Sequence, residues 1–409
     1  MQTDWTSFAH NRLWLTALLV LSASACAENG ASHVAAASQT SAPVSDTATS
    51  STVAATHAQP VDATKTWQWQ TIAEGLDHPW ALAFLPDGTF LVSERRGDLR
   101  TVSADGKVSA PISGLPKIDA GGQGGLLDVV LDTNFANNRR VYFCYSEPGN
   151  GGNSTALAEG LLSADNRRLT QVKTLFSQQP KVASSAHFGC RIVLAPDHIF
   201  MSMGDRYSRR DDAQNLGNHL GKIVRLNRDG SVPADNPFAN QTGARSEIWS
   251  YGHRNAQGLA TDAQGRLWEN EHGAQGGDEI NLIEAGKNYG WPVISYGKDY
   301  GGRKIGEGIT AQVGMEQPQY YWNPSIAPSG MAFVHGNRYG ADWNGNLLVG
   351  ALKFGYLARL TLNDSRIVHE EKIEVGERVR DVREAPDGLI YVLTDSRNGK
   401  LLRLQPDEM

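Results

Sequence analysis

One unit repeats six times along this chain, and it limits the possible folds more than any other feature of the sequence. Each copy has a short, mostly apolar run, a turn containing Asp, Asn or Gly, and a second run rich in aliphatic and aromatic residues. Runs of this kind, separated by turn residues, predict paired β-strands. Helical periodicity is scarce between them. The first runs begin near residues 79, 124, 187, 255, 329 and 380.

The repeat predicts an all-β fold, a six-bladed β-propeller with four-stranded blades. Successive copies leave room for about four strands and their loops, which is the size of one blade. A four-stranded sheet has two faces to cover, and radial stacking in a ring buries both. We expect residues 66–71 to supply the outer strand of the last blade and so close the ring. A pair of β-sandwich domains is the alternative, but the repeated inner strand argues against it.

The N-terminal residues 1–26 have the pattern of a secretory signal peptide. A basic residue precedes an apolar run that is too short to cross a bilayer. Small residues then lead to Cys26, as in a bacterial lipoprotein box, although Ala23 stands where that motif usually has Leu. Ordinary cleavage nearby is the alternative. Residues 27–65 are mostly Ala, Ser and Thr, which predicts a disordered tether before a propeller over 66–409.

The net charge and the cysteines give little information about the function. A net charge of −6, with no basic excess, does not indicate a nucleic-acid partner. Cys144 and Cys190 each lie in an apolar, strand-like run. An exported protein can oxidise such a pair, so a disulfide and two buried thiols are both compatible with the sequence.

Charged and polar residues stand where the inner strands begin. They are Gln123, His187, Arg254, Asn255, Arg378 and Arg380. In a propeller these strand entrances converge on the central channel, so we expect the six residues to line one pocket. Several cations around one histidine suit a small cofactor with several negative charges. A histidine among arginines should also have a lowered pKa and act as a neutral general base.

The sequence lacks the residues of several other chemistries. We find no dinucleotide fingerprint, P-loop, Ser nucleophile elbow or Cys-x-x-Cys pair, so nicotinamide, ATP and serine-hydrolase chemistry are disfavoured. The alternative for His187 is a hydrogen-bonded histidine at the end of a strand.

Two glycine-rich loops flank the apolar segment 258–268. Glycines let a backbone present its carbonyl groups to a ligand. Asp278 and Glu279 follow the second loop, where carboxylate and carbonyl oxygens together would suit calcium. Two solvated turns between strands are the alternative.

The motifs in combination resemble the soluble glucose/sorbosone dehydrogenases that depend on pyrroloquinoline quinone (PQQ), particularly the bacterial aldose sugar dehydrogenases. The resemblance extends from about residue 69 to residue 404. It rests on Gly-Gln123-Gly-Gly-Leu-Leu-Asp128, His187-Phe-Gly-Cys-Arg191, Gly-His-Arg254-Asn255-Ala-Gln-Gly258, Glu-His-Gly273-Ala274 to Asp-Glu279-Ile-Asn281, Asn-Tyr289-Gly-Trp-Pro292 and Arg378-Val-Arg380-Asp-Val382. The family fold is a six-bladed propeller, which agrees with the repeat.

The resemblance implies roles for individual residues. His187 would take the proton of the sugar's anomeric hydroxyl while hydride passes to C5 of the quinone. Arg254 would stabilise charge on the quinone oxygen. The other cofactor contacts implied are Gln123, Asn255, Tyr300, Ser325, Lys353, Arg378 and Arg380. The calcium ligands implied are the carbonyl groups of Gly273 and Ala274 beside the cofactor, and Glu279 with the carbonyl group of Tyr289 at a further site.

Two positions depart from the family pattern. Ala186 stands before the histidine where glucose-oxidising members have Asp, so the substrate should be oriented differently. Ala274 replaces a proline, which leaves the carbonyl group available but makes the loop less stiff.

We therefore expect a PQQ- and calcium-dependent aldose dehydrogenase of the periplasm or outer membrane. Its partners would be an aldose sugar and an electron acceptor that the sequence does not identify. The N-terminal lipid would be its only link to a membrane. A calcium-dependent lactonase propeller and a non-catalytic binding propeller are the alternatives.

Overall fold

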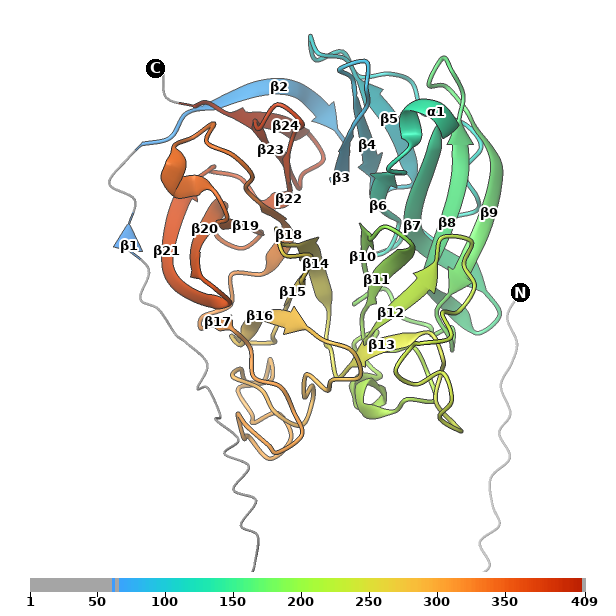
Figure 1. Cartoon of the computed structure of the whole chain (residues 1–409), viewed down its shortest axis with the longest axis vertical. Coiled ribbons are helices and arrows are strands. Elements are labelled where there is room, and N and C mark those ends of the chain that lie inside the picture. The colour runs from blue at the N-terminus through green and yellow to red at the C-terminus, as the bar shows by residue number, and fades with distance from the viewer. Residues whose placement is uncertain (1–60, 63–65, 407–409) are drawn as a thin grey trace, which may run out of the picture. The chain divides into compact units, whose positions relative to one another are not determined.

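The computed structural model of the chain describes residues 61–62 and 66–406, and within them six β-sheets are arranged around one axis. Figure 1 shows the inner strand of each sheet turned toward the centre of the ring. Neighbouring inner strands contact one another all the way round, from β3 and β6 to β22 and back to β3. The described part is thus a six-bladed β-propeller, and the prediction from the repeat is confirmed.

The inner three strands of every blade are antiparallel and follow one another along the chain. The inner strands are β3 (Pro79–Phe84), β6 (Leu126–Leu131), β10 (Gly189–Leu194), β14 (Ala256–Thr261), β18 (Pro328–Phe333) and β22 (Val379–Glu384). The second strands are β4 (Phe90–Glu94), β7 (Arg140–Gly149), β11 (His198–Met203), β15 (Leu267–Glu271), β19 (Leu347–Ala351) and β23 (Ile390–Thr394). The third strands are β5 (Asp98–Val102), β8 (Gly152–Leu162), β12 (Lys222–Asn227), β16 (Asp278–Ile283), β20 (Tyr356–Asn363) and β24 (Gly399–Leu404).

The outer strands show how the ring closes. Four blades take theirs from their own repeat, as β9 (Leu169–Ser177), β13 (Ile248–Tyr251), β17 (Tyr320–Trp322) and β21 (Arg366–Glu374). The last blade takes β2 (Trp69–Leu76), which pairs antiparallel with β24, so the expected closure is confirmed. The first blade has three strands in the described part, with a single bridge from Val102 to Val108 beyond β5. β1 (Val61–Asp62) adds a parallel fifth strand beside β21.

The core lies between adjacent sheets, as radial stacking requires. One cluster joins the first three blades through residues such as Trp80, Phe143 and Met201. Another joins the last blade to its neighbours through Trp343, Val382 and Leu401. Every inner strand is buried along its first four residues, because both of its faces meet a neighbouring blade.

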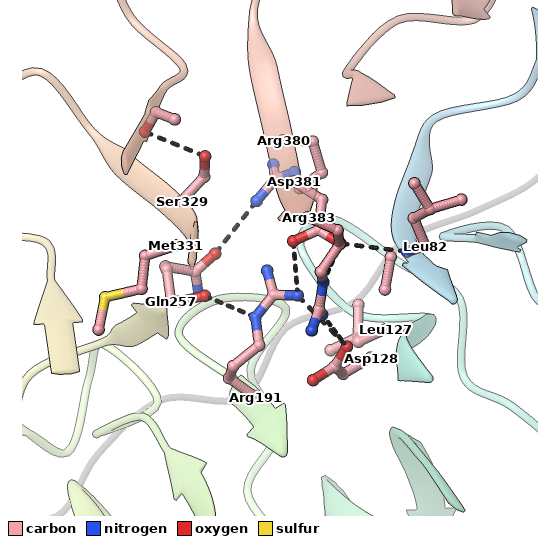
Figure 2. A network of polar contacts seen from close by, with 12 residues as sticks. Leu82, Leu127, Asp128, Arg191, Gln257, Ser329, Met331, Arg380, Asp381 and Arg383 are labelled. Atoms are coloured by element: carbon pink, nitrogen blue, oxygen red, sulfur yellow. Dashed lines mark hydrogen bonds and ion pairs between the residues drawn. The ribbon is translucent and has the colours of Figure 1, made fainter. Parts of the chain in front are cut away.

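An ionic network joins side chains of several inner strands at the centre of the ring (Figure 2). Arg191 donates to the carbonyl oxygen of Gln257 at 3.0 Å, to Asp381 at 3.0 Å and to Asp128 at 3.3 Å. Arg383 reaches the same two aspartates, each at 2.9 Å. Two buried carboxylates thus face two guanidinium groups, and this balance avoids an uncompensated charge inside the protein.

Several smaller features complete the described part. The short helices are α1 (Phe135–Asn138), η1 (Arg210–Gln214) and η2 (Ala341–Trp343). Cys144 of β7 and Cys190 of β10 are joined by a disulfide between the second and third blades. Among the described residues, no helix has the length and hydropathy needed to span a membrane. The expected signal peptide, Cys26 and nearly all of the tether lie outside the described residues.

Candidate active site

A cavity of about 160 Å³ lies where the inner strands begin. Four residues singled out from the sequence line it, namely Gln123, Asn255, Arg378 and Arg380. Arg95, Gln257 and His272, which the sequence analysis did not select, line it as well. The lining contains three arginines and no carboxylate, so the cavity favours an anion.

His187 stands two residues before β10 and is buried beside this cavity. Its backbone N–H donates to Oε1 of Gln123 at 2.8 Å, and the next blade holds Gly189 N through Oδ1 of Asn255 at 3.2 Å. A Cβ on Gly204 would lie 2.2 Å from the carbonyl oxygen of His187, so the close packing here requires glycine. These contacts bring His187, Gln123 and Asn255 together from three different blades.

Asp205 is the nearest partner of the His187 ring, and the sequence analysis missed it. Its Oδ1 lies 2.6 Å from Nδ1 of His187, while its Oδ2 accepts from Nε1 of Trp291 at 2.8 Å. Burial lowers the pKa of His187, the contact with Asp205 opposes this, and Arg254 and Arg206 lower it further. The lowered pKa was expected, but burial rather than the arginines is its main cause. With Nδ1–H turned to Asp205, the Nε2 atom keeps a lone pair that can accept a proton.

Asp395 organises the arginines of the cavity. It accepts from Nη2 of Arg380 at 2.7 Å, and Nδ1 of His78 lies 2.7 Å from its other oxygen. Arg378 and Arg95 approach the same carboxylate at 3.5 and 4.0 Å. Burial alone would raise the pKa of Asp395, but these cations hold it well below its ordinary value. One carboxylate against three arginines leaves positive charge for a ligand to neutralise.

Arg254 connects the cavity to the glycine-rich loop. Its Nη1 donates to the carbonyl oxygen of Gly273 at 2.6 Å, and its Nη2 donates to the Tyr300 hydroxyl at 3.3 Å. The calcium hypothesis assigns this carbonyl group of Gly273 to a metal ion. Ala274 follows it and is buried against Trp291.

Asp278, which the sequence places next to the glycine-rich loop, holds two loops together through its carboxylate. Its carboxylate accepts from Gly273 N at 2.8 Å, from Ile326 N at 2.7 Å and from the Ser325 hydroxyl at 2.7 and 2.9 Å. These hydrogen bonds fix the backbone of both loops. Ser325, implied as a cofactor contact, has its hydroxyl turned to this carboxylate.

An acidic cluster lies within the fourth blade, behind the glycine-rich loop. Glu269 and Glu271 of β15 and Glu279 of β16 are brought together because Glu271 and Glu279 are direct cross-strand partners. Burial first, and the charge of Glu271 second, raise the pKa of Glu269 and of Glu279 well above the ordinary value. His253 faces the cluster, with Nδ1 3.4 Å from Oε1 of Glu271.

The donor set of this cluster suits a hard cation. Ligand atoms of His253, Glu269 and Glu271 lie within 4.8 Å of one another. Oε1 of Glu269, Oδ1 of Asn281 and Nδ1 of His253 are buried without a hydrogen-bond partner in the described part. A group of carboxylates in which one carboxylate oxygen and one amide oxygen lack partners is compensated well by calcium. Tyr289 stacks on His253 with 4.9 Å between ring centroids.

Two implied cofactor contacts lie at the exposed edge of the site. Lys353 follows β19 and is exposed, with Nζ 5.0 Å from the centroid of the Phe354 ring. Tyr300 is 52% exposed. The structure therefore brings Arg254 and Tyr300 together, but among residues 61–62 and 66–406 no carboxylate pairs with Lys353.

A larger hollow of about 550 Å³ lies at the opposite mouth, where β3, β6 and β22 end. Its lining is mostly apolar, and its one arginine, Arg383, is already paired with Asp128 and Asp381. The smaller cavity, rather than this hollow, combines cations, a histidine and unpaired donors.

Comparisons with known proteins agree with this geometry. A model of the Glucose / Sorbosone dehydrogenase family matches residues 76–403. Aldose sugar dehydrogenase YliI of Escherichia coli is 46% identical over 344 residues, which cover 82% of this chain and 92% of that protein.

Solved structures give the same result. The soluble aldose sugar dehydrogenase from Escherichia coli in its apo form has 44% identity and a TM-score of 0.81, covering 84% of this chain and 100% of that one. The PQQ-bound form of an aldose sugar dehydrogenase from Streptomyces coelicolor has 28% identity and a TM-score of 0.67, covering 83% of this chain and 99% of that one.

Proposed function

Because this chain belongs to the Glucose / Sorbosone dehydrogenase family, we propose that it oxidises aldose sugars at the anomeric carbon, using PQQ and calcium. The observation that carries the proposal is the pairing of His187 with Asp205 beside a cavity that contains three arginines and no carboxylate. This arrangement combines a base with a binding site for a polyanion. The PQQ-bound relative of similar fold supports the choice of cofactor.

The residues present fit PQQ, which carries several carboxylates and a quinone. Arg254 and Arg380 each retain a buried Nε without a partner in the described part. Unpaired donors of this kind are costly unless a ligand accepts from them. Arg95, Arg378 and Arg380 would hold the carboxylates from within the cavity, and Lys353 would approach from its edge. Gln123, Asn255 and Tyr300 would complete the binding site, whereas Ser325 would act through Asp278.

In the proposed reaction His187 removes a proton and the C1 hydrogen leaves as hydride. Nε2 of His187 takes the proton of the anomeric hydroxyl, and Asp205 stabilises the imidazolium that forms. When bound, PQQ supplies the acceptor for the hydride, so the sugar leaves as its lactone. Arg254 stabilises the negative charge that develops next to it.

Calcium has two proposed sites in this chain. The acidic cluster would hold one ion through Glu279 and the Tyr289 carbonyl group, with Glu269 and Glu271 beside them. The carbonyl groups of Gly273 and Ala274 would hold another, in place of the hydrogen bond that Gly273 now accepts from Arg254. An ion there would polarise the quinone as a Lewis acid.

Export to the periplasm or outer membrane is proposed from the N-terminal sequence, with Cys26 as a lipidated first residue. One acyl chain binds membranes only marginally, so anchoring would need the several chains of a bacterial lipoprotein.

Reconstitution tests the function directly. Metal-free protein should reduce a redox dye with an aldose only after PQQ and calcium are both added. Activity restored by nicotinamide or flavin, or lactone hydrolysis without dye reduction, would reject the proposal.

A further inference from the structure

Tyr207 presents an aromatic ring to solvent beside the proposed base. The residue is 53% exposed, and its ring centroid lies 5.2 Å from that of His187 with the two planes at 86°. Tyr300, also about half exposed, lies 6.4 Å away. No hydrogen bond holds the Tyr207 hydroxyl in the described part of the chain. Large exposed aromatic side chains around a cavity commonly mark a contact surface.

The backbone of Tyr207 is held in an unfavourable conformation. Arg206 and Tyr207 have φ angles of 58° and 62°, in the left-handed region. This region is unfavourable for residues other than glycine, and strain of this kind gathers at functional sites. The Tyr207 N–H donates at 2.7 Å to Oδ1 of Asp205, the oxygen that also holds His187. One carboxylate oxygen therefore positions both the base and the aromatic ring.

The buried side chain of Arg206 fixes the strained turn from the protein interior. Its side chain is fully buried and donates to the carbonyl oxygens of Ala186, Asn153 and Ser184 at 3.1, 3.0 and 2.6 Å. Its guanidinium also lies 3.9 Å above the Phe188 ring. The exposed ring of Tyr207 thus stands on a rigid base, so it can bind a ligand at little cost in conformational entropy.

We propose that Tyr207 binds the sugar, with its ring stacked on the C–H face of an aldopyranose. The inference rests on the proposed function and adds a specificity-determining residue to it. Pyranoses carry apolar C–H groups on their ring faces, which pack well on an aromatic surface. Ala186, directly before His187, has no side chain that could donate a hydrogen bond. Stacking on Tyr207 would therefore supply a contact for the sugar near the base that Ala186 cannot give.

Two variants distinguish the contribution of the Tyr207 ring from that of its hydroxyl group and from that of the backbone turn. Tyr207→Phe keeps the ring. Tyr207→Asn removes it but tolerates the left-handed conformation. With the full chain loaded with PQQ and calcium, Tyr207→Asn should raise KM for glucose or xylose about tenfold, equivalent to about 1.4 kcal/mol. The kcat and the PQQ titration of Tyr207→Asn should stay within about threefold of the wild type, because the variant loses sugar binding without a change in the chemical step. Tyr207→Phe should keep the wild-type KM, because the ring that binds the sugar is still present.

Each other outcome contradicts a different statement. Wild-type protein that oxidises no aldose overturns the proposed function and this inference together. An active wild type with an unchanged KM in Tyr207→Asn overturns the stacking alone. Loss of PQQ binding in that variant shows a role in holding the cofactor or the fold instead. An equal rise of KM in Tyr207→Phe assigns the effect to the hydroxyl. If Tyr207→Asn does not fold, Tyr207→Gly makes the same test, since glycine is free to adopt a positive φ.

Discussion

Oδ1 of Asp205 lies 2.6 Å from Nδ1 of His187, and the same carboxylate receives Nε1 of Trp291 on its other oxygen. Asp205 follows β11 in the third blade, whereas Trp291 lies in the loop after β16 of the fourth. The carboxylate is thus held from two blades, and it holds the histidine in one orientation and one tautomer. The hydrogen bond on one ring nitrogen of a histidine decides whether the other nitrogen can act as a base.

Replacing the base should remove turnover but not cofactor binding. His187→Gln keeps similar bulk but cannot accept the proton, so kcat should fall about 10²–10⁴-fold. PQQ affinity should stay within a few-fold of the wild type, because the arginines meet the charges of the cofactor. Turnover of an aldose and PQQ binding are measured on the same sample. Near-normal turnover with PQQ bound would show that another group is the base.

Replacing its partner should change both the rate and the pH profile. In Asp205→Asn the amide donates to Nδ1 and leaves the proton on Nε2, which is the wrong tautomer for a base, so we expect kcat to fall about 10²-fold or more. Asp205 raises the pKa of His187, so without it the acidic limb of kcat/KM should move to lower pH. Trp291→Phe removes only the other hydrogen bond and serves as the control. An unmoved limb in Asp205→Asn would contradict the pairing.

The pH dependence of the wild type follows from the same pKa. Burial holds the pKa of His187 below its ordinary 6.5, so the folded protein keeps this histidine neutral where an unfolded chain would protonate it. The unfolded state then binds more protons below pH 6.5, and this contribution to stability falls as the pH falls. We expect turnover to persist below pH 6.5 and to be lost only in more acidic solution. A midpoint above pH 6.5 for the acidic limb would contradict this.

The arginine group should control cofactor affinity rather than the chemical step. Arg380→Ala and Arg95→Ala each remove one charge-assisted contact, so we expect weaker PQQ binding with a smaller effect on kcat at saturating PQQ. Losses of about tenfold or more per contact are reasonable for charged hydrogen bonds. Arg167→Ala, at an exposed position outside the site, is the control. A normal PQQ titration in Arg95→Ala would remove Arg95 from the binding site.

Calcium should stabilise the fold through the acidic cluster, even without PQQ. Treatment with a chelator leaves the buried Glu269 and Glu271 and the partly buried Glu279 without a counter-ion, so the melting temperature should fall by several degrees and recover with calcium. Glu269→Gln lowers the negative charge and should reduce this calcium-dependent shift. Equal melting curves with and without calcium would contradict the site.

The lipid hypothesis concerns residues outside the described part. If Cys26 is the first residue of the mature chain, the intact mass of exported protein should show acylation at that residue. Cys26→Ser should release the protein from membranes without changing its activity. An unacylated wild-type mass would show that the signal peptide is cleaved in the ordinary way.

The sequence alone was enough to predict the fold, because each inner strand carries its own turn residues. All six expected starting positions fall within two residues of an observed inner strand, and residues 69–71 do pair with the last blade. The same reasoning placed Gln123, Asn255, Arg378 and Arg380 in one cavity. It succeeded because blade geometry brings equivalent positions together.

Four of the residues that were missed share another position in the repeat. Arg95, Asp205, His272 and Asp395 stand one or two residues after a second strand. An antiparallel partner returns to the mouth where the inner strand began, as Val379 opposite Thr394 shows. A search for charged residues after each second strand would have found them. Which oxygen or nitrogen they meet depends on register and rotamers, and the sequence does not encode these in any local pattern.

The pairing of β2 with β24 also brings the two ends of the propeller together, since the Gln405 N–H donates to the carbonyl oxygen of Gln68 at 2.9 Å. The blades therefore form a closed ring, and which blade comes first depends only on where the two chain ends lie. A short peptide joining these two residues would allow new termini in a surface turn between other blades. Such circularly permuted enzymes would keep the cavity intact while moving any membrane tether to a different side of it.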